Sequence, residues 1–395
     1  MTGAPPADRP PPTAATVCLP GASVSPASTN DTSFAAVIVG WQRQHGRHGL
    51  PWQHTTDPYR VWLSEIMLQQ TQVSTVLGYY ARFLERFPDV QALAAASQDE
   101  VMSLWSGLGY YSRARNLHAC AKAVVSLHGG SFPRSSAGLQ TLPGIGRSTA
   151  AAIAAFCFGE RVAILDGNVK RVLTRYLAFD ADLAVASNER MLWERATALL
   201  PQDDGIEAYT QGLMDLGATV CLARAPLCLL CPAQAACAGR LSGRPERFPV
   251  KSRKLKRRQR SNTWLWLQWG ARLWLSQRPD QGVWAGLWSF PEFDSVSALE
   301  DAGTAWPGGG RPLPAFTHVL THLDWTLLPV RWALPPDTPA AQVDLITAGL
   351  PAGRWVDLDT ALSMGLPSAL RKLLLRSGGD AEGQGRLEDL PATST

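Results

Sequence analysis

A glycine-rich turn followed by an acid is the strongest chemical signal in this sequence. The turn at 142–146 reads LPGIG, an alanine-rich helix is predicted from Arg147, and Asp166 follows about twenty residues after the turn. Gly144 and Gly146 allow backbone angles that other residues resist, so successive N–H groups can point at one anion. The unpaired N–H groups and positive dipole end of the following helix strengthen such a site. The pattern predicts a phosphate-binding site beside a carboxyl group. The alternative is an ordinary turn between two helices.

A second carboxyl group, Glu65, lies inside a predicted helix among large apolar residues, in VWLSEIMLQQTQV. Apolar surroundings raise the pKa of a carboxyl group, so it can act as a general acid near neutral pH. The alternative is a solvated glutamate on a polar helix face. Gln69 and Gln70 follow and suit base edges, or else are surface residues. Asp166 can also cap the helix predicted from about Val169, whose dipole would keep the acid ionised.

Four of the seven cysteines lie within seventeen residues, spaced C-x6-C-x2-C-x5-C: Cys221, Cys228, Cys231 and Cys237. Structural zinc sites usually separate two C-x2-C pairs along the chain, whereas this compact set suits a cubane iron–sulfur cluster. The N-terminus shows no secretory signal pattern, which favours a metal in a reducing cytosol over disulfides. We therefore expect a [4Fe-4S] cluster, with zinc or free thiols as the alternatives, and a cytoplasmic protein.

Composition limits the partners. The net charge is only +4, but Lys251–Arg260 places seven basic residues in ten. No apolar run is long enough to span a bilayer, so no membrane partner is expected.

The segment Gly107–Leu117, GLGYYSRARNL, places two tyrosines on a loop interrupted by glycines, beside two arginines. These rings can stack on or wedge between bases, or they form a buried aromatic pair.

Two kinds of pattern divide the chain. From Phe34 to about Gly239 the pattern is helical, with roughly nine or ten helices and no credible strand. After the basic run, Thr263–Leu275 alternates large apolar residues around Gly270, which predicts a hairpin. Short strands and a closing helix at Ser368–Arg376 follow. The expected organisation is a disordered tail (1–30), an all-α domain (31–245), a basic linker (246–262), an α+β domain (263–378) and a second disordered tail (379–395).

Five features together resemble those of the helix–hairpin–helix DNA glycosylases, and within them the adenine DNA glycosylases of the MutY type. They are SEIMLQQTQV, GLGYYSRARNLH, LPGIGRSTA, LDGNVKRVLTR and the cysteine spacing. The resemblance is close over 34–239 and looser beyond. It implies a six-helix barrel and an iron–sulfur cluster lobe with DNA between them, followed by a Nudix-like domain that reads 8-oxoguanine. The implied enzyme is a monomer of the bacterial cytosol that excises adenine opposite 8-oxoguanine or guanine in double-stranded DNA.

The same resemblance implies roles for individual residues. Glu65 would protonate N7 of adenine, and Asp166 would stabilise or attack the sugar cation. The recognition loop would be 320–322, where Leu320 stands in place of the family's phenylalanine. The segment QGVWAGLWSFPEF resembles a Nudix remnant without its acidic metal-binding signature, which argues against pyrophosphohydrolase activity. The implied DNA contacts are Trp52, Gln69, Gln70, Tyr110, Gly144, Gly146, Ser148, Thr321 and His322.

The chemistry of base removal agrees with two carboxyl groups. Loss of a purine leaves an oxocarbenium-like sugar, which calls for one protonated and one ionised carboxyl group, and the base must first leave the stack. An endonuclease III-like pyrimidine glycosylase with lyase activity is the nearest alternative. Its relatives carry a lysine at the place of Ser148, and a hydroxyl cannot form an imine. A non-catalytic DNA clamp is the other alternative, and it has no need of Glu65 at an apolar position.

Overall fold

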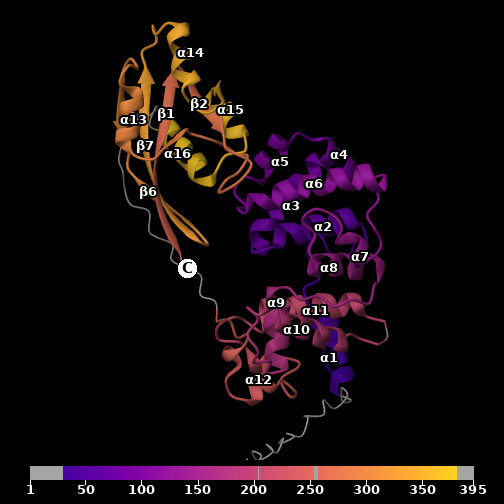
Figure 1. Cartoon of the computed structure of the whole chain (residues 1–395). Helices are drawn as coiled ribbons and strands as arrows, with labels where there is room; N and C mark the ends of the chain where they lie inside the picture. Colours follow the sequence, from indigo (N-terminus) through magenta and orange to yellow (C-terminus); the bar gives the residue numbers. More distant parts are fainter. Residues whose placement is uncertain (1–29, 203, 253–256, 380–395) are drawn as a thin grey trace, which may run out of the picture.

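The computed structural model describes residues 30–202, 204–252 and 257–379. The tails predicted to be disordered, 1–30 and 379–395, lie outside these residues apart from one residue each. The chain forms a helical part and a sheet-containing part, as expected (Figure 1). Among the described residues, none of the helices combines the length and apolar character that a membrane span requires.

The helical part has more helices than its sequence pattern predicted. Three of the helices, α4, α7 and α12, have only four to six residues, which is too short for a helical period to stand out. Short 3-10 turns occur at Cys228–Leu230 and Pro245–Arg247. The α-helices described here are α1 (Asn30–His45), α2 (Pro58–Leu68), α3 (Val73–Arg86), α4 (Val90–Ala95), α5 (Gln98–Trp105), α6 (Tyr111–His128), α7 (Ser136–Leu139), α8 (Arg147–Phe158), α9 (Gly167–Tyr176), α10 (Ala186–Ala198), α11 (Ile206–Thr219) and α12 (Ala238–Leu241).

The helix α8 is the shared wall between two lobes. Ala150, Ile153 and Ala154 pack into the core formed by α2–α7, while Ala151 and Ala155 pack into the core of α1 and α9–α11. Small side chains let helices approach from both sides, which explains why this helix is rich in alanine. The lobes are visible one above the other, with α9–α12 and α1 below α2–α8 (Figure 1).

Side-chain caps fix the starts of two helices of the barrel. The Asp57 side chain accepts a hydrogen bond from the Tyr59 N–H, and Pro58 opens α2. Ser97 and Glu100 form both hydrogen bonds of a capping box at the start of α5. These short-range contacts fix where α2 and α5 begin, and therefore the register of Glu65 along α2.

An eight-stranded mixed sheet forms the second part, with β3-β2-β1-β7-β5 as its main order and the other strands paired with β1, β2 or β7. The predicted hairpin is confirmed as β1–β2, joined at Gly270. The predicted closing helix is α16. The elements are β1 (Arg258–Trp269), β2 (Arg272–Gln277), β3 (Trp288–Ser289), β4 (Glu292–Phe293), α13 (Val296–Gly303), β5 (Gly309–Pro312), β6 (Phe316–Leu320), β7 (Leu323–Leu334), α14 (Ala340–Ala348), β8 (Gly353–Val356), α15 (Leu358–Ser363) and α16 (Ser368–Gly379).

The basic segment ends earlier than expected. The linker was predicted to extend to residue 262, but β1 begins at Arg258 and pairs in parallel with β7 from that residue onward. Asn262 is buried and accepts a hydrogen bond from the Trp325 indole N–H. Hydrogen bonds to β7 satisfy the backbone of this segment. Its basic side chains favoured a linker in the sequence analysis, because pairing with a strand so far along the chain leaves no local sequence signal.

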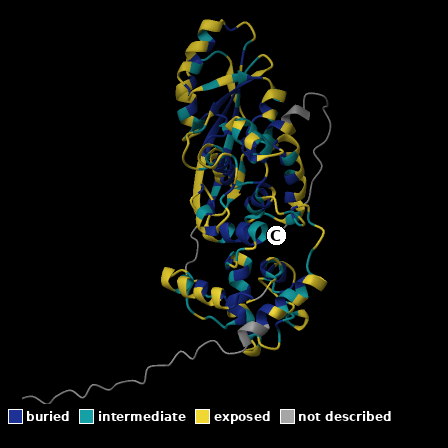
Figure 2. Cartoon of the chain, turned by 90° about the vertical axis from the view of Figure 1, so that its right-hand side faces the viewer, coloured by how far each residue is buried: buried dark blue, intermediate teal, exposed yellow. Residues whose placement is uncertain are grey.

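The sheet-containing part docks directly on the helical barrel. Asp99 on α5 accepts a hydrogen bond from the Trp288 indole at 3.2 Å and lies 3.7 Å from the Arg354 guanidinium. Tyr111 on α6 donates to the Leu366 carbonyl oxygen at 3.0 Å. One core cluster of buried residues includes members of both parts, and Figure 2 colours the buried residues of the chain dark blue. The docking holds the β6–β7 hairpin over the same side of the barrel as the loop before α6.

Candidate active site

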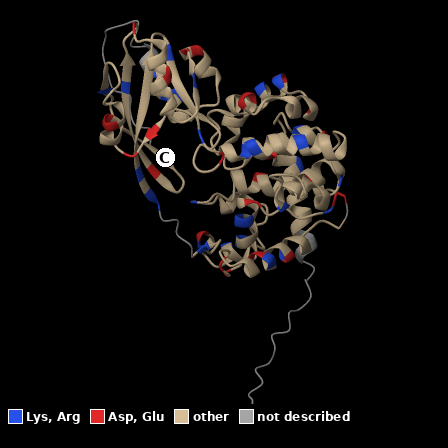
Figure 3. Ribbon diagram, turned by 45° about the horizontal axis from the view of Figure 1, so that its top comes forward, with Lys and Arg blue, Asp and Glu red and all other residues tan. Residues whose placement is uncertain are grey.

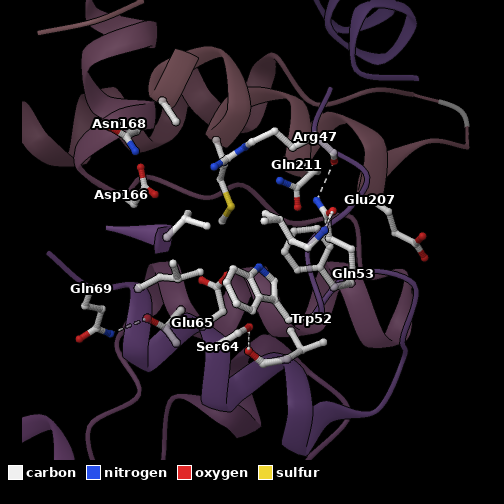
Figure 4. A pocket seen from close by; sticks show the side chains of 18 of the residues that line it. Arg47, Trp52, Gln53, Ser64, Glu65, Gln69, Asp166, Asn168, Glu207 and Gln211 are labelled. Carbon is white, nitrogen blue, oxygen red and sulfur yellow. Dashed lines mark hydrogen bonds between the residues drawn. The ribbon is translucent and has the colours of Figure 1, made fainter. Parts of the chain in front are cut away.

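The two predicted carboxyl groups line one cleft between the lobes. The cleft has a volume of about 1140 Å³. Glu65 reaches it from α2 in the barrel, and Asp166 from the start of α9 in the other lobe (Figure 4). Of the other predicted site residues, Trp52, Gln69, Gln70 and Ser148 also line the cleft. The sequence separates these groups by a hundred residues, and the lobe arrangement brings them together.

Glu65 is the group in the cleft best suited to carry a proton. It is only partly accessible, and protein surrounds it on most sides except the cleft itself. Burial, and secondarily the negative charge of Asp166, raise the pKa of the Glu65 carboxyl from 4.5 to about 8. At neutral pH the protonated form is therefore favoured, as the apolar neighbours in the sequence predicted.

Asp166 caps α9 and faces the cleft. Its carboxylate accepts a hydrogen bond from the Val169 N–H at 2.7 Å, which confirms the predicted cap. Burial raises the pKa of the Asp166 carboxyl group, and hydrogen bonds from the Val169 and Asn168 N–H groups at the start of the helix oppose that rise. Ser148 accepts from the Leu165 N–H at 3.0 Å. The hydroxyl of Ser148 thus fixes the backbone directly before Asp166.

A network that the sequence analysis missed holds the loop bearing Trp52. The backbone N–H and the guanidinium of Arg47 both donate to the buried Asp215 carboxylate, at 2.9 and 2.7 Å. The Gln53 amide in turn donates to the Arg47 carbonyl oxygen at 2.8 Å. Trp52 is 8 % exposed and packs edge-on against Tyr80. An aspartate inside the apolar stretch GLMDLG was the one available signal, since Arg47 and Gln53 look like surface residues.

Gln70, which lines the cleft, and Tyr110, which does not, stand on two strained loops. Their φ angles are +56° and +47°, in the left-handed region that non-glycine residues rarely adopt. Tyr110 is 44 % exposed, whereas Tyr111 is buried, so the predicted aromatic pair divides into one surface and one core residue. The Tyr110 and Thr321 hydroxyl groups lie 2.9 Å apart. The turn between β6 and β7, Thr321 and His322, therefore reaches the loop before α6.

The glycine turn uses its two glycines differently. Gly144 has a φ of +75°, and a Cβ atom there would lie 2.6 Å from the Asn116 side chain. Gly146 has an ordinary φ of −82° and is the N-cap of α8. The backbone angle that favours glycine therefore occurs at Gly144 and not at Gly146. Its lack of a side chain instead leaves the approach to the first N–H groups of α8 open, since nothing lies within 4 Å of a Cβ at this position.

The four clustered cysteines surround a second, smaller cavity. Cys221, Cys228, Cys231 and Cys237 all line it, together with Arg175 and Arg240. Within the described part of the chain, no three His, Cys, Asp or Glu side chains converge closely enough to hold a single metal ion. Sulfurs spread around a cavity, and not gathered on one point, fit a group larger than one zinc ion, whose Zn–S bonds are about 2.3 Å long. Four cysteine thiols around one cavity are a donor set that an iron–sulfur cluster can take.

Comparison with known proteins assigns the chain to a family. Residues 63–197 match the HhH-GPD superfamily of base excision DNA repair proteins, and 263–376 match the NUDIX domain. The "Adenine DNA glycosylase" of Buchnera aphidicola subsp. Baizongia pistaciae is 35 % identical over 350 residues, covering 87 % of this chain and 96 % of the relative. The chain belongs to the adenine DNA glycosylase family. The human "Adenine DNA glycosylase" is 35 % identical over 412 residues, covering 87 % of this chain and 73 % of the relative.

A solved thermostable thymine-DNA glycosylase is 29 % identical, with a TM-score of 0.48, over 54 % of this chain and 97 % of that one. The range that matches the HhH-GPD superfamily, 63–197, contains both Glu65 and Asp166 of this adenine DNA glycosylase family member. It ends before the four clustered cysteines. One matched domain lies within the helical part of the fold, and the other covers most of the α+β part.

Glu65 is expected to lower stability as the pH rises. Its folded-state pKa of about 8 lies above the ordinary 4.5, so between these values the folded state holds a proton that the unfolded state has lost. Stability therefore falls with increasing pH across this window, by on the order of a few kcal/mol. Glu65→Gln removes the titration and keeps the shape. Urea unfolding should show the variant more stable than wild type at pH 8, with the difference shrinking towards pH 5; a difference independent of pH would contradict this.

Proposed function

We propose that this protein hydrolyses the N-glycosidic bond of adenine in duplex DNA where adenine stands opposite 8-oxoguanine or guanine. The observation that carries the proposal is the pair of carboxyl groups, Glu65 and Asp166, facing one cleft from opposite lobes. The family relatives named adenine DNA glycosylases support the choice of base. The proposed enzyme acts as a monomer in the bacterial cytosol and removes the base without cutting the strand.

The chemistry divides between the two acids. Glu65, whose pKa of about 8 leaves it protonated at neutral pH, donates its proton to N7 of the extruded adenine and makes the base a better leaving group. Asp166 carries the negative charge that stabilises the oxocarbenium-like sugar. A water molecule completes the hydrolysis, after which Glu65 regains its proton from solvent.

The groups near the sugar favour hydrolysis over strand cleavage. Ser148 offers a hydroxyl, which cannot form the imine that a lyase needs. The nearest lysine along the chain, Lys170, lies 2.5 Å from the Glu189 carboxylate and is held in that ion pair. A lyase reaction would require a free amine at the sugar, so the monofunctional reaction is the better fit.

Duplex DNA would lie along the open side of the cleft. The turn at Gly144 and the N-terminal N–H groups of α8 would hold phosphates, while Gln69, Gln70 and Tyr110 meet the stacked bases. Thr321 and His322 at the β6–β7 turn would contact the base opposite adenine. Two basic residues, Arg258 and Arg260, stand at the beginning of β1 and support electrostatic attraction of the phosphate backbone. Figure 3 colours the lysines and arginines of the chain blue.

The cysteine cavity is proposed to hold a [4Fe-4S] cluster on Cys221, Cys228, Cys231 and Cys237. The bound cluster would supply a structural cross-link of the loop beside α9. Arg175 supports this role, since its buried guanidinium lies 3.4 Å from the Cys221 sulfur and donates to the Leu222 and Ala223 carbonyl oxygens.

Cys228→Ser is expected to lose most of the bound iron, because removing one of four thiolate ligands weakens the site. Iron and acid-labile sulfide should be equimolar in the wild-type protein and should give visible absorbance. Cys157→Ser, which changes a cysteine outside the cavity, is the control and should keep both. Stoichiometric zinc in a colourless wild-type protein would refute the cluster.

The proposed reaction is tested on duplexes with adenine opposite 8-oxoguanine, guanine or thymine. After incubation, each duplex is divided into samples with and without hot alkali. Strand breaks at adenine opposite 8-oxoguanine or guanine that appear only after alkali are the expected result. Breaks without alkali would indicate a lyase, and tight binding without any breaks would indicate a non-catalytic clamp.

A further inference from the structure

One buried arginine connects the loop that bears Gln70 with the loop that ends at Tyr110. Arg113 lies on α6, is 8 % exposed, and none of the roles described so far uses it. Its guanidinium donates to five oxygens on two separate segments of the chain. The acceptors are the carbonyl oxygens of Ile66 and Met67 at 2.9 Å, the Thr71 hydroxyl at 3.1 Å, and the carbonyl oxygens of Leu108 and Gly109 at 3.2 and 3.3 Å.

The first segment is the end of α2. Carbonyl groups in the last turn of a helix lack partners within the helix, and a cation is favoured there by the helix dipole. Ile66 and Met67 lie in the last turn of α2, the helix that carries Glu65. Arg113 therefore satisfies the end of α2 and fixes where the following loop, with Gln70, leaves the helix.

The second segment is the loop before α6, which ends at Tyr110. The guanidinium carbon of Arg113 lies 5.4 Å from the centre of the Tyr110 ring and 5.2 Å from that of Trp105. A planar guanidinium can donate along several directions within one plane, whereas an ammonium group is a point charge. One side chain thus sets the separation between Gln70 and Tyr110.

Both loops need this support. Gln70 and Tyr110 each adopt a left-handed backbone conformation, which costs on the order of 1–3 kcal/mol per residue and persists only where the surroundings impose it. The hydrogen bonds from Arg113 to Thr71 and to Gly109 each lie one residue from a strained position. Losing them would let either loop relax independently of the other.

We propose that Arg113 is a positioning residue for base extrusion, holding Gln70 and Tyr110 at the spacing at which both enter the duplex together. This inference rests on the proposed adenine excision. It assigns Arg113 to the extrusion step and not to bond cleavage, because the guanidinium contacts the loop backbones and touches neither carboxyl group of the cleft.

The test is Arg113→Lys, with Arg82→Lys, an exposed arginine of α3, as the matched control. Extrusion is followed by the fluorescence of 2-aminopurine opposite 8-oxoguanine. Excision is followed in single turnovers with adenine either paired with 8-oxoguanine or unpaired in a one-base bulge. An unpaired base costs less to extrude. We expect Arg113→Lys to slow extrusion and excision of the paired adenine roughly tenfold to a hundredfold, with a much smaller loss for the bulge.

Equal losses on the two substrates, or wild-type fluorescence, would overturn the inference, since a general loss of structure affects both alike. Thr71→Val removes one acceptor and leaves the guanidinium in place. Its excision rate should also fall more for paired adenine than for bulged adenine, with a smaller loss than in Arg113→Lys. This variant keeps the test valid even if Arg113→Lys does not fold. If Thr71→Val left the ratio of the paired-adenine rate to the bulged-adenine rate unchanged, that result would also count against the proposed role of Arg113. A wild-type protein that extrudes 2-aminopurine but excises nothing would instead refute the proposed function.

Discussion

Glu65→Gln is expected to eliminate nearly all adenine excision while leaving the binding of mispaired duplex intact. The substitution keeps the size of the side chain but removes the proton that burial and Asp166 keep on the carboxyl group near neutral pH. Loss of a general acid typically slows a reaction about 100-fold to 10,000-fold. Because the amide is neutral, it resembles the protonated acid, and the cleft is not disturbed by an unpaired charge.

Single-turnover excision and a binding titration on the same duplex separate these effects. Glu85→Gln, an exposed glutamate of α3, is the control and should behave as wild type in both measurements. If Glu65→Gln turned over at the wild-type rate, Glu65 would have no place in the mechanism. If it lost binding in parallel with turnover, its role would lie in holding DNA and not in proton transfer.

The sequence predicted best those features that depend on neighbours along the chain. Glu65 was found through its apolar neighbours, and the cysteine set through its spacing. The cap formed by Asp166 needed only the three residues that follow it. Each of these signals lies within one turn of helix or one short loop, where local physical chemistry is decisive.

The features that the sequence analysis missed depend on contacts between distant segments. The carboxylate of Asp215 holds Arg47 across 168 residues, and Tyr110 meets Thr321 across 211 residues. The start of β1 at Arg258 depends on β7, and its basic side chains pointed to a linker. Surface-like residues become part of a site only when the lobes meet, so composition and periodicity could not reveal them.

Asp166→Asn is the second substitution with a large expected effect, and it tests charge with little change in structure. Asparagine caps helices about as well as aspartate, so the hydrogen bond from the Val169 N–H and the start of α9 should survive. The negative charge facing the sugar is lost. Removing one preorganised electrostatic group costs about 100-fold to 1,000-fold in rate, and excision should fall by this amount in single turnovers.

The same variant should move the pH dependence of excision. In the wild type, the reaction should slow as the pH rises through about 8, because Glu65 then loses its proton. Asp166 contributes to that high pKa through like-charge repulsion, so without it the pKa of Glu65 falls and the alkaline limb shifts to lower pH. Asp57→Asn, which changes a capping aspartate outside the cleft, should shift nothing. An alkaline limb that stayed in place in Asp166→Asn would mean that the two carboxyl groups do not sense each other across the cleft, and that burial alone keeps Glu65 protonated.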